Sequence, residues 1–94
     1  MHFAITCTDK PGNLDLRLAT RPKHLEYLDS QVAHIVVAGP LLDTEGKNPV
    51  GSLLVVDFPD EAAAQAFAAA DPYAQAGVFE SVTIQPFRVV YPKA

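Results

Sequence analysis

The chain has 94 residues, of which 49% are hydrophobic and 19% charged, and its formal net charge is -4. This length accommodates one domain, so we expect a single domain over residues 1–94, and the acidic balance argues against a nucleic-acid partner, which needs a basic face. A single cysteine excludes an internal disulfide, and no apolar run reaches the roughly 18 residues of a membrane span, so we expect a cytoplasmic protein without membrane contact.

The first residues alternate as a half-buried strand does. Phe3, Ile5 and Cys7 fall on one face of residues 2–8, with small or polar residues on the other. Turn-forming residues follow at positions 9–13. The chain is therefore expected to open with a strand and a tight turn.

The next segment has the spacing of an amphipathic helix, with apolar residues at Leu14, Leu18, Leu25, Leu28 and Val32. Proline lacks an N–H and its ring clashes with the preceding turn, so Pro22 argues against one regular helix through this region. We expect a loose turn from Leu14. The main helix should start with Thr20 as its cap, hold Pro22 in its first turn and end near Gln31.

Two apolar strands are expected next. Residues 35–38 form a short strand that Gly39 and Pro40 stop, and residues 41–49 have the composition of a loop. Residues 51–58 contain four consecutive apolar residues, a pattern typical of an interior strand with both faces covered.

The last third of the chain predicts a helix and a strand. Asp60 can cap an alanine-rich helix over residues 61–70, which an aspartate–proline pair then ends. A final strand is expected over residues 79–91, with Pro86 at a bulge or at a sheet edge.

The order of these elements, β-α-β-β-α-β, is that of an α+β, ferredoxin-like fold with an antiparallel sheet and both helices on one face. Large apolar residues occur on both faces of the last strand, including Val82, Ile84 and Phe87. A second copy of the chain would cover the free face through a two-fold axis. We therefore expect a homodimer through the free sheet face.

His24 is the main candidate for proton transfer, because histidine titrates near neutral pH. It lies beside Leu25 and Leu28, at the border of the apolar stripe, with Arg21 one helical turn before it. Arg17 lies near as well if the preceding turn is helical. A guanidinium near a helix start can clamp a carboxylate, so the pair suits a small anionic ligand. The alternative is that His24 is a border residue satisfied by water or by a backbone carbonyl.

Asp71 is the candidate partner of His24, far away in the sequence. Because Pro72 follows it and one helical turn begins at Tyr73, Asp71 has the features of a helix N-cap. A carboxylate has about four acceptor sites, so a capping aspartate can also bind a histidine. The sequence leaves open whether Asp71 pairs with His24 or only caps a helix.

The other polar residues are weaker candidates. Ser52 and Thr6 can line a pocket but also suit ordinary strand positions, and Asp9 suits its turn. Cys7 is expected to be a buried small hydrophobe and no nucleophile. No spacing of histidine, cysteine and carboxylate residues resembles a metal site, and no glycine-rich phosphate loop is present, so we expect no metal and no cofactor.

The chain resembles the YciI-like (YCII-related) domain family in several short motifs, which occur in order over nearly the whole length: Arg21-x-x-His24-Leu25, Ala38-Gly39-Pro40, Gly51-Ser52, Asp71-Pro72-Tyr73, Ala76-Gly77-Val78 and Pro86-Phe87. The resemblance implies a ferredoxin-like fold that forms a dimeric α/β barrel. It also implies a cleft with a His–Asp pair as active site. Carried over by motif, the catalytic residues are His24 and Asp71, and the substrate-binding residues are Arg21, Ser52 and Tyr73.

The resemblance also implies a function. Members of the family include an enzyme that removes chloride from a chlorinated hydroxyquinol, and the fold resembles that of muconolactone isomerase. The expected activity is that of a cofactor-independent lyase or isomerase on a small anionic or phenolic ring compound. In it His24 moves a proton, Asp71 orients the imidazole and Arg21 holds a carboxylate or phenolate. The alternative is a non-catalytic module that binds a small ligand or a partner and retains a remnant cleft.

Overall fold

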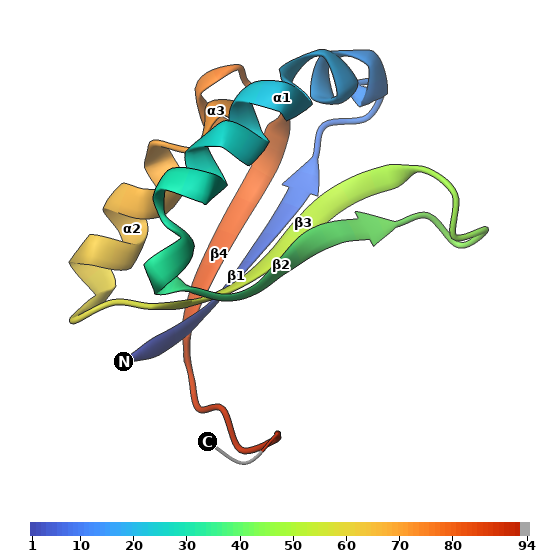
Figure 1. Cartoon of the computed structure of the whole chain (residues 1–94). Helices are drawn as coiled ribbons and strands as arrows, with labels where there is room; N and C mark the ends of the chain where they lie inside the picture. Colours follow the sequence, from blue (N-terminus) through green and yellow to red (C-terminus); the bar gives the residue numbers. More distant parts are fainter. Residues whose placement is uncertain (93–94) are drawn as a thin grey trace.

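A computed structural model of the protein describes residues 1–92. Its elements, in chain order, are β1 (His2–Asp9), α1 (Leu14–Ser30), the short 3-10 helix η1 (Val32–His34), β2 (Ile35–Leu42), β3 (Pro49–Asp57), α2 (Glu61–Ala69), α3 (Pro72–Gln75) and β4 (Phe79–Phe87). The four strands form one antiparallel sheet in the order β2-β3-β1-β4, and the helices cover one of its faces (Figure 1). The predicted ferredoxin-like α+β fold is confirmed. None of the helices within residues 1–92 is long and apolar enough to cross a membrane.

The hydrophobic core lies between the sheet and α2. The predicted inward face of β1 is buried, with Phe3 at 0% exposure and Ile5 at 1%. In the pairing of β1 with β3, Phe3 lies opposite Val56 and Ile5 opposite Leu54. Phe67 of α2 packs on this layer. Because apolar burial is the dominant favourable contribution to folding, we expect this half of the molecule to contribute most of the stability.

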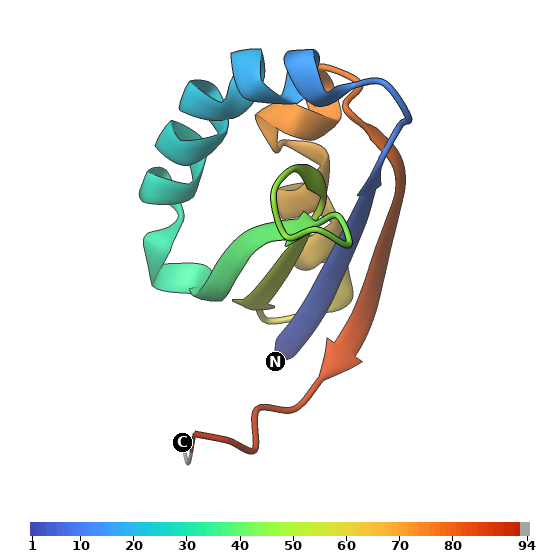
Figure 2. The same cartoon turned by 90° about the vertical axis from the view of Figure 1, so that its right-hand side faces the viewer.

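The first helix differs from the prediction. α1 runs without a break through Pro22, so the expected start at Thr20 is wrong. A proline inside a helix removes one backbone hydrogen bond and bends the helix, and Figure 2 shows α1 as an arc. Thr20 is no cap; its hydroxyl donates to the carbonyl of Leu16 at 2.8 Å. The predicted end is confirmed, since Gln31 is the C-cap.

The second strand also continues further than predicted. β2 passes through Gly39 and Pro40 and ends at Leu42, so these two residues do not stop it. β2 is an edge strand, and a proline is tolerated where its missing N–H faces away from the ladder. The loop that follows turns at Gly46, whose φ of 72° favours glycine.

The last strand is shorter than predicted. β4 ends at Phe87, and the expected extension to Tyr91 is wrong. Pro86 lies on an edge strand, which is one of its two predicted positions. The register shift between β1 and β4 occurs at Thr8 and Asp9 and not at Pro86.

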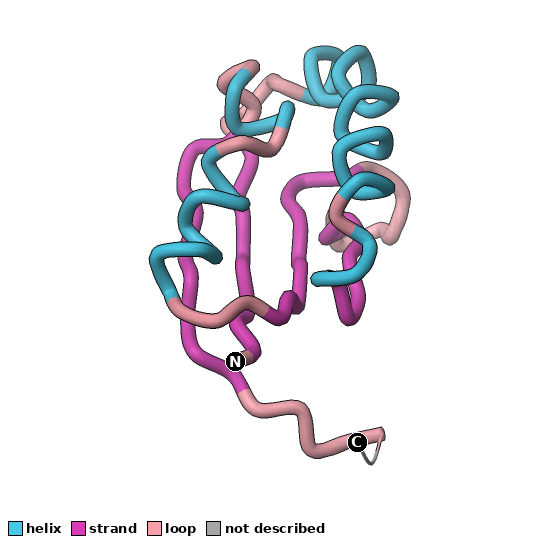
Figure 3. The backbone as a smooth tube through the Cα atoms, turned by 60° about the vertical axis from the view of Figure 1, so that its left-hand side comes forward, coloured by secondary structure: helices cyan, strands magenta, loops and turns pink. Residues whose placement is uncertain are grey.

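The two long helices lie differently over the sheet. α2 lies over β1 and β4, whereas α1 lies over β2 and β3 (Figure 3). Leu18 and Leu25, which belong to the predicted apolar stripe of α1, are 51% and 41% exposed. The buried residues of α1 are instead Arg17, Thr20 and His24. The most buried side chains of α1 are therefore polar, and together with leucines of the same helix they form one wall of the candidate site.

Candidate active site

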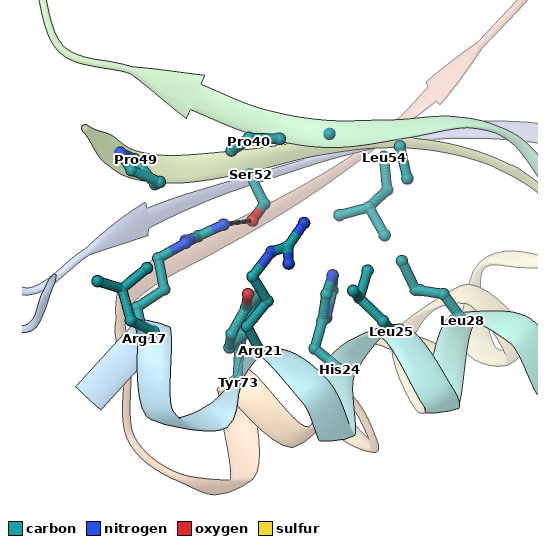
Figure 4. Close-up of a pocket in the computed structure, with 13 residues that line it drawn as sticks. Arg17, Arg21, His24, Leu25, Leu28, Pro40, Pro49, Ser52, Leu54 and Tyr73 are labelled. Atoms are coloured by element: carbon teal, nitrogen blue, oxygen red, sulfur yellow. Dashed lines mark hydrogen bonds between the residues drawn. The ribbon is translucent and has the colours of Figure 1, made fainter. Parts of the chain in front are cut away.

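A cleft of about 250 Å³ lies between α1 and the strands β2 and β3 (Figure 4). Leucines of α1 and residues of the sheet such as Pro40 and Leu54 form its apolar walls. Five polar or aromatic side chains also line it: Arg17, Arg21, His24, Ser52 and Tyr73. Typical small-molecule sites span roughly 300–1,000 Å³, so this cleft suits a ligand about the size of a single substituted ring.

His24 and Asp71 are in direct contact. The Nδ1 atom of His24 lies 2.8 Å from Oδ1 of Asp71, and both side chains are almost fully buried. Because a carboxylate oxygen accepts, the imidazole donates through Nδ1–H. The neutral ring then carries its free electron pair on Nε2. His24 points toward the cleft in Figure 4, so its other ring nitrogen is available to a ligand.

Asp71 has both of the roles that the sequence left open. It is the N-cap of α3, where its Oδ1 accepts the backbone N–H of Tyr73 at 2.9 Å. The same oxygen accepts the His24 hydrogen bond. The cap geometry therefore holds the carboxylate in place, and the carboxylate in turn fixes the orientation of the imidazole.

Tyr73 lies between Arg17 and His24. Its ring stacks on the His24 ring with centroids 4.0 Å apart and planes 19° apart, and the Arg17 guanidinium lies 4.5 Å from its centroid. The imidazole and the guanidinium are both too close to the Tyr73 ring to lie on the same face of it, so they lie on opposite faces. Burial raises the pKa of the Tyr73 phenol, an effect that the nearby Arg17 and Arg21 partly oppose. The phenol therefore stays protonated and can donate a hydrogen bond at neutral pH.

Arg17 forms a buried network with Asp9 and Ser52. Its Nη1 donates to both carboxylate oxygens of Asp9, at 2.8 and 3.0 Å, and its Nη2 donates to Ser52 Oγ at 2.6 Å. Next to Ser52, a Cβ at Gly51 would overlap the carbonyl oxygen of Cys7. This position therefore needs glycine, and the close approach of the two strands helps place Ser52 at the cleft.

Arg21 differs from Arg17 in its partners. It is exposed, lies one turn before His24 on α1 and lines the cleft. Within residues 1–92, no carboxylate forms an ion pair with Arg21. Its charge is therefore available to an anionic ligand, whereas the charge of Arg17 is matched by Asp9.

The sequence-predicted residues His24, Asp71, Arg21, Ser52 and Tyr73 thus meet at one cleft or directly behind it. Sequence reasoning missed the Arg17–Asp9 pair. Arg17 precedes Arg21 by four residues, which is the spacing of helix neighbours. The sequence therefore placed Arg17 near His24 if the turn before Pro22 is helical, as it is, but no spacing indicated the pairing of Arg17 with Asp9.

The remaining candidates lie outside the site. Cys7 is buried, and burial raises the pKa of its thiol to about 12, so it is no nucleophile at neutral pH. Thr6 is exposed and alternates with the inward residues of β1, on the sheet face away from the helices. In the described part of the chain, no three histidine, cysteine or carboxylate groups lie close enough together to hold a metal ion.

Fold and cleft together define a ferredoxin-like α+β protein with a histidine–carboxylate pair under its first helix. The model of the YCII-related domain family matches residues 1–88, and the chain belongs to this family. Its relatives include Protein YciI of Escherichia coli and of Shigella flexneri. Each is 38% identical over 100 residues, which cover 97% of this chain and 100% of the relative. An uncharacterized protein of Haemophilus influenzae is 36% identical over 98 residues. The predicted resemblance is confirmed.

Two solved structures resemble the chain to different degrees, one in both sequence and fold and the other in fold alone. The chain is similar to 5-chloro-2-hydroxyhydroquinone dehydrochlorinase from Burkholderia phenoliruptrix, in complex with 2,5-dihydroxybenzoquinone, with a TM-score of 0.85, 30% identity and 94% coverage of each chain. An antibiotic biosynthesis monooxygenase matches with a TM-score of 0.54 and 16% identity, over 94% of this chain and 99% of that one. The second match supports the fold alone.

Proposed function

We propose that the protein is a cofactor-independent lyase or isomerase that moves a proton on a small anionic or phenolic ring compound. The observation that carries the proposal is the 2.8 Å contact of His24 with Asp71 at the wall of a cleft. A histidine oriented by a buried carboxylate is a common arrangement for general acid–base catalysis.

In this proposal His24 is the base and later the acid. Asp71 holds the Nδ1–H, so Nε2 takes a proton from the substrate. The resulting imidazolium is stabilised by the adjacent carboxylate charge. The same nitrogen then returns the proton to another atom of the ring, which completes an isomerisation or promotes loss of a leaving group. A positioned base of this kind contributes about 10²–10⁴-fold to the rate.

The other residues of the cleft would bind the substrate. Arg21 would pair with a carboxylate or phenolate, because its charge has no protein partner in the described chain. The Tyr73 phenol would donate a hydrogen bond to a ring substituent. Apolar walls that include Leu25 and Leu54 would enclose the ring itself. The volume of about 250 Å³ favours a monocyclic compound.

The similarity to the dehydrochlorinase supports this choice of chemistry. That protein shares 30% identity over 94% of each chain and was solved with a dihydroxybenzoquinone bound. Loss of hydrogen chloride from a hydroxylated ring needs only proton transfers and the departure of chloride with the bonding electron pair. It needs no external oxidant or reductant, so a histidine–aspartate pair suffices for it.

The proposal is tested by incubating the protein with 5-chloro-2-hydroxyhydroquinone and measuring chloride release. We expect turnover by the wild type and a loss of about 10²–10⁴-fold in His24→Gln. His34→Gln is the matched control, because His34 is exposed and does not line the cleft. Thermal unfolding of each variant shows whether the fold is intact.

Equal turnover by wild type and a folded His24→Gln variant would contradict a catalytic role of His24. If the wild type binds ring compounds in the cleft but consumes none of a panel of hydroxylated and carboxylated rings, the non-catalytic binding module is the better description. In that case His24→Gln would weaken ligand binding, and neither the wild type nor the variant would convert the ligand.

We also propose that the protein is a homodimer through the sheet face away from the helices. Four apolar side chains on this face are more than a third exposed: Val37, Leu41, Leu53 and Phe87. Apolar groups gathered on one face favour association, and a two-fold axis pairs such a face with itself.

The oligomeric state is tested by analytical ultracentrifugation, which should give twice the chain mass of 10.1 kDa. Leu53→Glu should yield the monomer. Val82→Glu is the control, because Val82 is 41% exposed but lies on the helix-covered face. A wild type that sediments as a monomer at high concentration would contradict the proposal.

A further inference from the structure

The hydroxyl of Ser52 has an unusual set of hydrogen bonds for a buried group. Its oxygen accepts from Nη2 of Arg17 at 2.6 Å, and the residue is only 3% exposed. A guanidinium has donors only, so the Ser52 proton cannot point toward Arg17. Within residues 1–92, no acceptor receives that proton. Because Ser52 lines the cleft, its O–H is free to donate to a ligand.

Arg17 increases the strength of this donor. A hydroxyl whose oxygen accepts from a cation is polarised and becomes a better donor in its turn. The Arg17 side chain is 4% exposed, and both oxygens of Asp9 hold its Nη1. The guanidinium is therefore fixed, and its charge is already matched. Arg17 therefore influences a ligand in the cleft mainly through the two side chains that it contacts, Ser52 by a hydrogen bond and the Tyr73 ring by a cation–π contact.

Ser52 and His24 lie on opposite sides of the cleft. Ser52 comes from β3 in the sheet, and its bond to Arg17 is drawn as a dashed line in Figure 4. His24 comes from α1 and points toward the sheet. A ring bound between them meets a base on one side and a strong hydrogen-bond donor on the other.

We propose that the Ser52 hydroxyl donates a hydrogen bond to a carbonyl or phenolate oxygen of the substrate. Arg17 and Asp9 are then positioning residues that keep the Ser52 O–H directed toward the cleft. This inference rests on the proposed function and specifies its substrate class as a ring that bears an acceptor oxygen. When His24 takes a proton from the substrate, the electron pair left behind moves onto that oxygen. The Ser52 hydroxyl then stabilises the oxyanion, and both groups are restored when the proton returns.

The test is a binding measurement by titration calorimetry with 2,5-dihydroxybenzoquinone as the probe. We expect Ser52→Ala to weaken binding by about 10–100-fold, the usual effect of losing a hydrogen bond to a charged group. Ser52→Thr keeps the hydroxyl and should recover most of the affinity. Ser81→Ala makes the same change at an exposed residue outside the cleft, and it should bind as the wild type does.

A spectroscopic probe tests the positioning role. A donor to the oxygen of bound 4-nitrophenolate stabilises its ground state and moves its absorption band to shorter wavelength. We expect the largest shift in the wild type, a smaller one in Asp9→Asn and the smallest in Ser52→Ala, where only Arg21 and Tyr73 remain as donors. A purely structural role of Asp9 would change the melting temperature but leave the band of the bound probe in place.

The inference is overturned if folded Ser52→Ala binds both probes as the wild type does, or if the wild type binds neither. These results are independent of chloride release, which tests His24. A protein that loses affinity in Ser52→Ala but shows no turnover would support the donor role and contradict the proposed enzymatic activity.

Discussion

The two halves of the helix layer cover the same sheet in different ways. Under α2, Phe58, Ala64 and Phe67 pack on the sheet and are at most 8% exposed. Under α1 the side chains that point inward are Arg17 and His24, and a cleft separates the helix from β2 and β3. One half is a closed apolar core, and the other is an open cleft that combines charged and apolar side chains.

The difference follows from the side chains of the two helices. α2 is rich in alanine, and small side chains allow it to lie close to the sheet. α1 carries long polar residues and an internal proline. Its buried polar groups each have a partner, since Arg17 pairs with Asp9 and His24 is hydrogen-bonded to Asp71. No buried side-chain nitrogen or oxygen in residues 1–92 lacks a partner, so the site half avoids the cost of unpaired polar groups.

The strongest way to test this division is to truncate one apolar side chain in each half. Phe67→Ala should lower the free energy of unfolding by about 3–5 kcal/mol, because it leaves a cavity in the core. Leu25→Ala, at the cleft and 41% exposed, should cost less than about 1 kcal/mol. Urea denaturation followed by circular dichroism measures both. Similar losses would mean that both halves contribute equally to stability.

A second prediction concerns two glycines of neighbouring strands. Gly51→Ala should cost about 1–3 kcal/mol, because the new Cβ would overlap the Cys7 carbonyl and push the strands apart. Gly39→Ala is the matched control, since nothing lies within 4 Å of the Cβ that it would add. The same shift should displace Ser52 and weaken probe binding. Equal stability of the two variants would contradict the close approach at Gly51.

The alkaline pH dependence of stability reports on Cys7, which lies in the core and pairs with Ser52 across the strands. The folded thiol keeps its proton up to a pKa of about 12, whereas an unfolded thiol has the ordinary value of 9.0. Stability therefore falls as pH rises from 9 toward 12, by about 1.4 kcal/mol at pH 10. Denaturation at pH 8 and pH 10 measures this loss. Cys7→Ala should remove it, leaving the later effects of Tyr27 and Tyr73, whose pKa values are also raised by burial. An unchanged pH dependence in Cys7→Ala would contradict the assignment.

The smallest stability effect is expected at the two capping aspartates. Asp60 caps α2 through the N–H of Ala63, and asparagine caps about equally well, so Asp60→Asn should change stability by less than about 0.5 kcal/mol. Asp71→Asn also keeps a cap acceptor but removes the charge beside His24. Nitrogen-15 NMR should then show a weaker Nδ1–H hydrogen bond of His24, because a neutral amide oxygen accepts less strongly than a carboxylate, whereas Asp60→Asn leaves it unchanged. Identical His24 spectra in both variants would contradict the orienting role of Asp71.

Much of the fold was predictable because it depends on local pattern. The alternation of Phe3 and Ile5, the apolar run of β3 and the cap at Asp60 each identify an element from its own residues. The errors in α1 and β2 occurred where a proline or glycine was taken to interrupt an element. Pro22 and Pro40 are tolerated because one lies in a bent helix and the other on a sheet edge, and neither context is visible in the chain.

The site was predictable in its residues but not in its geometry. The pattern of the sequence indicated His24, Arg21 and the capping Asp71, since these residue types and spacings have a chemical meaning by themselves. The 2.8 Å contact between His24 and Asp71, and the pairing of Arg17 with Asp9, join residues far apart in the chain or separated by a turn. Only the packing of α1 and α3 over one sheet brings these groups together, because a hydrogen bond depends on distances that no local sequence rule specifies.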